Sequence, residues 1–226
     1  IVFFSVPKTG STAIETALGP LASIAVTSPP ELKHAPVYRY NRFFRPMVDK
    51  FVGDDVETIA VIREPLSWLG SWYRYRQRPF LDGKPTSTRD ISFERFVEAY
   101  LGETPPPFAN VGAQSKFVEP RPNGTSIKRM FQYEHLDDCI DYFETKLGQK
   151  IELPNKNVSP SSALELSAEL EESLRQKCSA DFALWASIKR FIRPAIELKA
   201  VNIGAVMVDL AFGTAISKLS CPNSTA

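Results

Sequence analysis

Cysteine and histidine are scarce in this sequence. Its 226 residues include three cysteines, Cys139, Cys178 and Cys221, and two histidines, His34 and His135. The cysteines are odd in number and no two of them stand in a CxxC spacing, which argues against a disulfide framework and against a zinc site. We therefore expect the cysteines to be buried or incidental.

An excess of charge of either sign is also missing. Lys and Arg number 27 and Asp and Glu number 26, which gives a formal net charge of +1, and 43% of the residues are hydrophobic. This balance excludes a disordered chain and a protein that binds nucleic acid through its overall charge. Any anion site must therefore be local.

Hydrophobic runs long enough for a membrane span are missing too. The apolar stretch at residues 202–216 is interrupted by Asp209 and is shorter than the roughly 20 residues that a transmembrane helix needs. No basic segment precedes an apolar run at the start of the sequence. We therefore predict neither a transmembrane segment nor a signal peptide. The compartment stays unassigned, with the cytoplasm favoured for a chain of bacterial origin.

The sequence begins with the pattern of a strand, a turn and a helix. Four apolar residues, 1–4, predict a buried strand, and helical spacing after Gly10 predicts a helix that Gly19 and Pro20 end. Residues 57–65 predict a stronger buried strand. Its last residue, Pro65, is placed to open a helix that runs to about Arg78.

Helices and strands alternate along the rest of the chain. Apolar periodicity and end signals predict a short strand at 23–30, a helix capped by Ser92, a strand at 126–134, a helix ended by Gly148 and a helix at 168–187. This alternation predicts an α/β fold with a parallel sheet between two layers of helices. The length suits one domain. We place it at residues 1–190, followed by an extension of unassigned structure at residues 191–226.

The turn after the first strand, SVPKTGST at residues 5–12, has the composition of an anion site. A turn that leads from a strand into a helix presents unpaired backbone N–H groups and the positive end of the helix dipole. Gly10 lets the backbone approach closely, Ser11 and Thr12 add hydroxyl donors, and Lys8 adds a full charge. The plain alternative is a serine or threonine helix cap beside a chance lysine.

The end of the second strand favours the anion site. The loop lacks the G-x-x-x-x-G-K-[ST] pattern, which argues against an ordinary ATP or GTP site. Nucleotide triphosphatases commonly have a magnesium-binding Asp on a neighbouring strand, whereas IAVIREP ends in Arg63, which binds anions. Ser71 lies along the helix that follows, close enough to share a phosphate with Arg63. A lysine and an arginine together predict a ligand with two anionic groups.

The two motifs resemble those of a known enzyme family. VPKTGST followed by REPLSWLGSWY is similar to the two cofactor motifs of the sulfotransferases that use 3′-phosphoadenosine 5′-phosphosulfate (PAPS). The first resembles the 5′-phosphosulfate loop, and the second, of the form R-x-P-x-x-x-x-x-S, resembles the 3′-phosphate motif. QYEHL and LPNKNVSP resemble further segments of the family. The likeness covers about residues 1–188.

The resemblance implies a fold, a cofactor site and a reaction. The fold is a three-layer parallel sheet with a P-loop-like nucleotide-binding core. The 5′-phosphosulfate would be held by Lys8, Thr9, Gly10, Ser11 and Thr12, and the 3′-phosphate by Arg63 and Ser71. An acceptor hydroxyl would attack the sulfur in line, and adenosine 3′,5′-bisphosphate would leave. No metal is needed in this scheme, because Lys8 neutralises the charge that grows on the bridging oxygen.

Such a transfer also needs a general base, and histidine suits that role because its ordinary pKa lies near neutrality. ELKHAPVYRY resembles the KHATAREI-like stretch of bacterial and carbohydrate sulfotransferases, whose histidine is in the base position. This likeness assigns the base to His34, although Ala35 and Pro36 depart from the family pattern. The alternative is a histidine at the surface or at a helix start. His135 is interpreted as a structural residue near a helix start.

The nature of the acceptor follows from the same likeness. The KHA and YRYRQR stretches look closer to carbohydrate and bacterial sulfotransferases than to phenol enzymes, which favours a glycan or a small polar hydroxyl compound. Arg74, Arg76 and Arg78 are interpreted as a solvated basic face, with a grip on an anionic glycan as the alternative. Gln114 is noted as a pocket residue.

Two functions of other classes stay open at this point. One is a kinase or another magnesium-dependent nucleotide triphosphatase with a degenerate loop. The other is a non-catalytic relative that keeps the fold as a binding module. The response to adenosine 3′,5′-bisphosphate without magnesium separates the first of these from a sulfotransferase.

Overall fold

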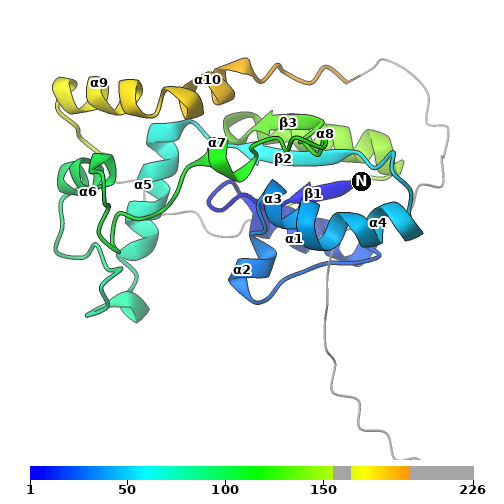
Figure 1. Cartoon of the computed structure of the whole chain (residues 1–226), viewed down its shortest axis with the longest axis horizontal. Coiled ribbons are helices and arrows are strands. Elements are labelled where there is room, and N and C mark those ends of the chain that lie inside the picture. The colour runs from blue at the N-terminus through cyan, green and yellow to red at the C-terminus, as the bar shows by residue number, and fades with distance from the viewer. Residues whose placement is uncertain (155–163, 194–226) are drawn as a thin grey trace, which may run out of the picture.

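A small parallel sheet lies at the centre of the fold (Figure 1), in a computed structural model that describes residues 1–154 and 164–193. Within this part of the chain the sheet has three strands, β1 (Val2–Phe4), β2 (Thr58–Ile62) and β3 (Arg129–Gln132), in the order β1-β2-β3. Phe4 is aligned with Ala60, which is aligned in turn with Met130. All five residues of β2 are buried, as in the middle strand of a parallel sheet. The predicted strands at the start of the chain and at residues 57–65 are confirmed.

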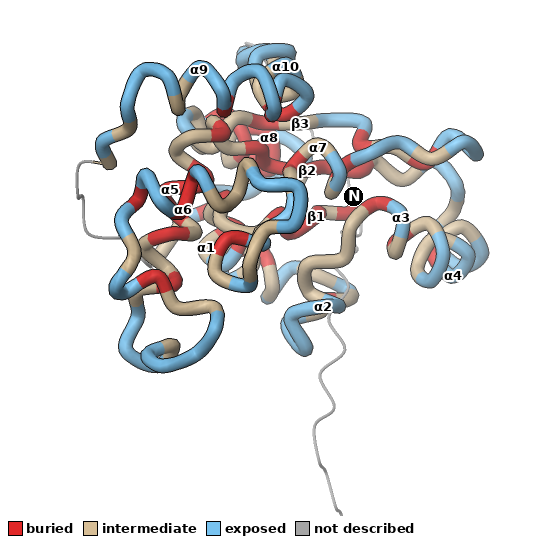
Figure 2. Tube along the Cα trace, turned by 60° about the vertical axis from the view of Figure 1, so that its left-hand side comes forward, coloured by how far each residue is buried: buried red, intermediate tan, exposed pale blue. Residues whose placement is uncertain are grey.

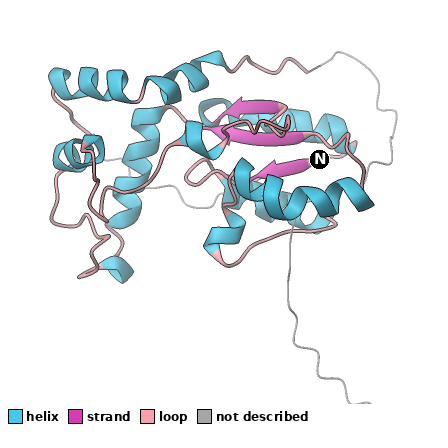
Figure 3. Cartoon of the chain, in the orientation of Figure 1, coloured by secondary structure: helices cyan, strands magenta, loops and turns pink. Residues whose placement is uncertain are grey.

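Helices pack against both faces of this sheet. Successive side chains of β2 point to opposite sides, so that this buried strand has apolar residues on each face for helices to cover. On one side Ile59 and Val61 join a core with α1 (Ser11–Leu18) and α8 (Leu136–Leu147). On the other side Ala60 and Ile62 join a core with α3 (Val37–Arg39), α4 (Arg45–Phe51) and residues next to α7 (Gln114–Phe117). Figure 3 shows the strands between these helices. The chain therefore has a mixed helix and sheet structure of the α/β kind.

A third core lies beside the sheet and, among the described residues, is formed by helices and the loops next to them. It joins α5 (Pro65–Arg76), α6 (Phe93–Leu101) and α9 (Ala168–Lys177) through buried residues such as Leu69, Phe96 and Leu174. The predicted cap of α6 is confirmed, because the Ser92 hydroxyl accepts a hydrogen bond from the Arg95 backbone N–H, 3.1 Å away. Figure 2 shows that the outer side of this core, α9 above all, is mostly exposed.

Two predicted elements are wrong. Residues 23–30 form no strand: Ala25 is buried in the core, but only Ala22 makes an isolated bridge, and α2 (Pro30–Lys33) follows. The single helix expected at 168–187 is two helices, α9 and α10 (Ser179–Ser187), broken at Cys178. The break is needed because Leu174 packs in the helical core whereas Leu184 packs beside the sheet.

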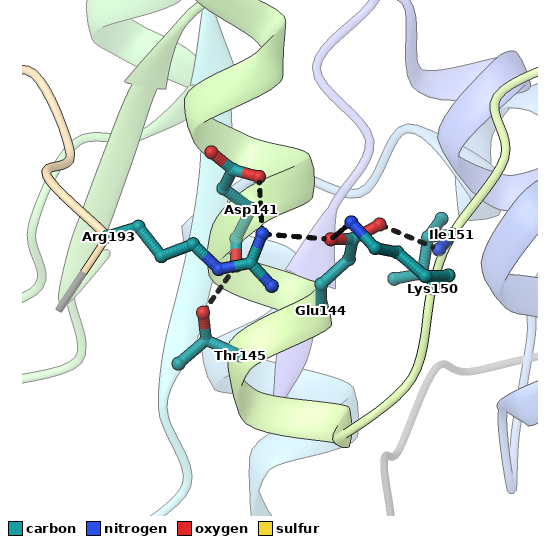
Figure 4. Close-up of polar contacts among 6 residues, drawn as sticks. All are labelled: Asp141, Glu144, Thr145, Lys150, Ile151 and Arg193. Carbon is teal, nitrogen blue, oxygen red and sulfur yellow. Dashed lines mark hydrogen bonds and ion pairs between the residues drawn. The ribbon is translucent and has the colours of Figure 1, made fainter. Parts of the chain in front are cut away.

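The last described residues are tied to α8. Arg190 makes two hydrogen bonds with the Asp138 carboxylate, at 2.6 and 2.9 Å, and the Phe191 ring packs against the core. Arg193 reaches Asp141 and Glu144, each at 3.2 Å, and Glu144 also accepts from Lys150 and from the backbone N–H of Ile151 (Figure 4).

Residues 194–226, most of the expected extension, lie outside the described residues. So does Cys221, while Cys139 and Cys178 are buried and free, as expected.

Candidate functional site

Three loops meet at one edge of the sheet, because parallel strands all end on the same side. They are residues 5–10 after β1, Arg63 and Glu64 after β2, and a 3-10 turn, Tyr133–His135, after β3. In open α/β sheets, ligands bind outside the carboxyl ends of the strands. A ligand site is therefore expected at this edge of the sheet.

The loop after β1 is held in shape by its own contacts and by α5. The Thr9 hydroxyl donates to the Val6 carbonyl, 2.8 Å away, and the Trp68 indole N–H donates to the Pro7 carbonyl, also at 2.8 Å. Lys8 and Gly10 have positive φ angles of 66° and 78°. Gly10 is the N-cap of α1, and no side chain caps this helix end. A serine or threonine cap, the plain alternative for this loop, is therefore not what the structure has.

Gly10 also allows a close contact with the turn after β3. A Cβ atom at this position would lie 3.1 Å from Cε2 of Tyr133, closer than ordinary packing. We expect Gly10→Ala to lose about 1 to 2 kcal/mol through its left-handed backbone and at least about 1 kcal/mol more through the overlap. Urea unfolding measures the sum.

Gly124→Ala is the matched control for this substitution. Gly124 has a φ of 85°, and a Cβ atom there would meet nothing within 4 Å, so that only the backbone contribution applies. Equal losses in the two variants would mean that the Tyr133 ring moves aside at no cost. In that case the ring does not fix the loop.

Arg63 joins the three loops. Its backbone is clamped by the buried Gln114 side chain, which accepts from the Arg63 N–H at 2.9 Å and donates to the Arg63 carbonyl at 2.7 Å. Its guanidinium donates to the Ser67 hydroxyl at 2.9 Å and to the Lys8 carbonyl at 3.3 Å, and it lies 4.3 Å from the centre of the Tyr133 ring. Lys8 and Arg63 are thus neighbours at the carboxyl edge of the sheet. Gln114, expected as a pocket residue, is a support for Arg63.

The Lys8 ammonium rests on aromatic rings. Nζ lies 3.1 Å from the centre of the Tyr75 ring and 4.9 Å from that of Trp72, both on α5. Among the described residues no carboxylate pairs with it, and burial, together with the charges of Arg78, Arg76 and Arg63, lowers the pKa of Lys8 to about 7. An anion bound here would restore the full charge.

One arginine of α5, Arg76, departs from the expected solvated face, whereas Arg78 follows the helix and is exposed. Arg76 is buried, and its guanidinium donates to the carbonyls of Pro107 at 2.8 Å and Asn110 at 3.1 Å. Arg78 lies over the Tyr75 ring, 5.0 Å from its centre. Both charges add to the positive potential around Lys8. The local basic cluster is therefore built into the fold, although the whole chain is close to neutral.

His34 lies at the end of α2 and is tied to the same loop. Its Nδ1 donates to the Ser5 carbonyl, 2.7 Å away, which leaves Nε2 as the unprotonated nitrogen of the neutral ring. Burial is the largest cause and lowers the pKa of His34. It outweighs the hydrogen bond to the Ser5 carbonyl and the charge of Glu15, which raise the pKa, and Lys33 and Lys8 add smaller lowering contributions. Since its ordinary pKa is about 6.5, His34 is neutral at pH 7 and able to accept a proton.

A small polar network holds His34 in place. The Ser5 hydroxyl donates to the Glu15 carboxylate, which also pairs with Lys33 at 2.7 Å. Ser5 and Lys33 are therefore fixed by one carboxylate of α1, and Lys33 is the neighbour of His34. Neither Ser5 nor Glu15 stood out in the sequence, because a serine before a loop and a glutamate in a helix are common.

Comparisons with protein-family models, curated proteins and solved structures give no match. The likeness to sulfotransferases therefore rests on the motifs of the sequence. Along residues 1–154 and 164–193, no helix is both long and apolar enough to cross a membrane, and no cluster of three or more His, Cys, Asp or Glu is arranged to hold a metal ion.

The remaining predicted site residues have unequal surroundings. Thr9 is fully buried and its hydroxyl is used within the loop. Ser11 is buried at the first turn of α1, whereas Thr12 is exposed and its hydroxyl lies 3.5 Å from Lys33 Nζ. Ser71 is buried on α5, and no described residue is hydrogen-bonded to its hydroxyl. The Thr9 hydroxyl is thus occupied within the loop. The hydroxyls of Ser11 and Ser71 are better candidates for donating a hydrogen bond to a ligand.

Three aromatic residues of the site were not assigned to it from the sequence. They are Trp72, Tyr75 and Tyr133, which lie against Lys8 and Arg63. The signals in the sequence that could have found them are the aromatic residues after Pro65 and the tyrosine of the YEH segment after the third strand. The sequence does not show which cation each of these rings contacts.

Proposed function

We propose that the protein is a sulfotransferase, with the three-layer fold of that family, which transfers a sulfuryl group from PAPS to a hydroxyl acceptor, a glycan or a small polar molecule. The observation that carries the proposal is the meeting of Lys8 and Arg63 at the carboxyl edge of a parallel sheet. Arg63 donates to two neutral oxygens, and among the described residues the Lys8 ammonium lies against aromatic rings and near other cations without an ion pair to a carboxylate. Buried charges without a partner are costly, so that this arrangement favours a doubly anionic ligand.

The donor set fits PAPS at both of its anionic ends. Lys8 and the uncapped start of α1 offer a charge and backbone N–H groups for the 5′-phosphosulfate. Arg63 and the Ser71 hydroxyl offer a charge and a donor for the 3′-phosphate. When bound, PAPS would supply the sulfuryl group and leave as adenosine 3′,5′-bisphosphate. The carboxylate that holds magnesium in nucleotide triphosphatases is replaced by Arg63, which disfavours that alternative.

The residues of the chain divide the chemical work in this proposal. Lys8 neutralises the charge that develops on the bridging oxygen of the leaving group. His34 takes the proton of the acceptor hydroxyl at Nε2, while its Nδ1–H stays with the Ser5 carbonyl. Tyr75 and Tyr133 hold the two cations in place from one side. No step in this division requires a metal ion.

Ligand-induced stabilisation tests the cofactor site. We expect adenosine 3′,5′-bisphosphate to raise the melting temperature in the absence of magnesium. At about 100 times its Kd a ligand stabilises by about 2.7 kcal/mol, which corresponds to about 5 to 10 °C for a domain of this size. Arg63→Ala should remove most of the shift, and Arg95→Ala, on the exposed side of α6, should keep it.

Three outcomes separate the candidate functions. A shift with adenosine 3′,5′-bisphosphate together with sulfation of a hydroxyl acceptor by labelled PAPS supports the sulfotransferase. A shift without turnover on any acceptor in a glycan screen supports a binding module. Indifference to the bisphosphate and to PAPS, with a shift caused by ATP and magnesium, overturns the proposal in favour of a nucleotide triphosphatase.

A further inference from the structure

One continuous helical segment has two apolar stripes. It consists of α3, a π-helical turn at Tyr40–Phe44 and α4. The inner stripe, Tyr40, Phe44 and Val48, follows a spacing of four residues and packs in the core beside the sheet. One such stripe is enough to hold a surface helix on its domain.

The outer stripe is formed by Phe43, Met47 and Phe51, again at a spacing of four residues. Their exposed fractions are 62%, 39% and 75%. Single exposed apolar residues are ordinary, but a row of them on one helix face marks an interaction surface. Figures 1 and 2 place α4 at the edge of the fold, away from α5, α6 and α9. The outer stripe is therefore separate from the third core, which α5, α6 and α9 form.

Cations surround the outer stripe. Residues 37–52 contain Arg39, Arg42, Arg45 and Lys50 against one carboxylate, Asp49, which gives 4 − 1 = +3. Asp49 is paired with Arg45 at 3.1 Å. The exposed Arg42 and Lys50 lie over the rings of the stripe itself, 5.1 Å from the centre of Phe43 and 5.3 Å from the centre of Phe51. Each exposed ring thus carries a cation at its side.

We propose that the outer stripe docks on an anionic lipid surface, with the two phenylalanines and Met47 at the level of the headgroups and Arg42 and Lys50 on lipid phosphates. Helices that lie in a membrane interface combine bulky apolar side chains with flanking Lys and Arg in this way. Charge complementarity favours anionic lipid over a second copy of the chain, because two such faces would bring like charges together. The proposal uses the exposed face alone and is independent of the sulfotransferase reaction.

Vesicle sedimentation with the whole chain tests this surface. We expect the protein to sediment with vesicles of phosphatidylcholine mixed with phosphatidylserine and to stay in solution with phosphatidylcholine alone. Added salt should weaken the binding, because the headgroup attraction is screened. The double variant F43S/F51S should lower the partition coefficient by about tenfold or more. Phe80→Ser is the matched control, since Phe80 is 56% exposed in another part of the fold, and it should bind as the wild type does.

A charge variant tests the second half of the proposal. R42E/K50E should lose binding to the mixed vesicles by about tenfold or more. K84E/R95E, which reverses two exposed cations elsewhere, should lose little. Unaltered melting temperatures of all variants exclude unfolding as the cause. Full binding by F43S/F51S, or no sedimentation of the wild type, overturns the proposal. A wild-type dimer that F43S/F51S turns into a monomer also overturns it and shows that a second copy covers the stripe.

Discussion

Lys8→Met is expected to lower turnover by about a hundredfold to a thousandfold and, at the same time, to raise the melting temperature of the ligand-free protein. The first effect follows because methionine has no charge for the leaving group. The second follows because the Lys8 ammonium is partly buried among Arg63, Arg76 and Arg78, and no carboxylate of the described residues pairs with it. Methionine fills the same space on the Tyr75 ring without that cost. A labelled-PAPS assay and thermal unfolding measure the two effects.

The gain in stability has a definite pH dependence. The folded state lowers the pKa of Lys8 to about 7, whereas the unfolded chain keeps a value near 10.4. Protons therefore bind the unfolded state more strongly, and the penalty is fully present below pH 7 and fades as the pH rises toward the unfolded value. The stabilisation by Lys8→Met should be largest at pH 6, clearly smaller at pH 9 and absent once the pH exceeds the unfolded value.

Lys8→Arg is the control, because it keeps the charge at every pH studied. We expect it to retain binding of adenosine 3′,5′-bisphosphate above pH 8, where the wild type loses affinity as Lys8 loses its proton. A Lys8→Met protein that is less stable than the wild type and equally active would contradict both the electrostatic role of Lys8 and its place in the site.

His34→Ala is expected to lower turnover by about a hundredfold or more while adenosine 3′,5′-bisphosphate still raises the melting temperature. The reason is that His34 is hydrogen-bonded to the Ser5 carbonyl, before the residues proposed to hold the cofactor, and would act on the acceptor side. In the wild type, turnover should rise with pH through the pKa of His34, because a base must be unprotonated. This acidic limb should lie below pH 6.5, since burial lowers the pKa of His34.

His34→Asn separates a chemical role from a structural one. An asparagine amide in this place can still donate to the Ser5 carbonyl, but it does not accept a proton near neutrality. Turnover as low as in His34→Ala assigns the base to His34. Recovery of turnover in His34→Asn shows a positioning role only. His135→Asn, at the N-terminal end of α8, should leave both turnover and its pH profile unchanged.

Local signals account for the elements that the sequence predicted correctly. Pro65 opens α5, Ser92 caps α6 and Gly148 ends α8 with a φ of 66°. Each of these signals acts within one helical turn, so that neighbouring residues contain the whole cause. The two wrong elements have the opposite property. Residues 23–30 needed a partner strand, and the helix expected at 168–187 had to face two different cores.

The candidate site likewise combines features that neighbouring residues determine with contacts between segments that are distant in the sequence. The sequence alone placed Lys8, Gly10 and Arg63 directly after strands, because strand, turn and helix signals are local. It left open what each cation would meet.

The sequence by itself determined the segments that form β1, β2 and β3, the helices α1, α5, α6 and α8, the lysine loop and the arginine after the second buried strand. Tertiary structure alone decided that β2 lies between β1 and β3, which brings Arg63 to the Lys8 carbonyl, Tyr133 and Gln114, the last 51 residues away along the chain. It also decided that Lys8 meets Tyr75 instead of a carboxylate. The physical reason is that contacts between distant segments depend on strand pairing and on the packing of helices across the sheet, and no short stretch of residues contains that information.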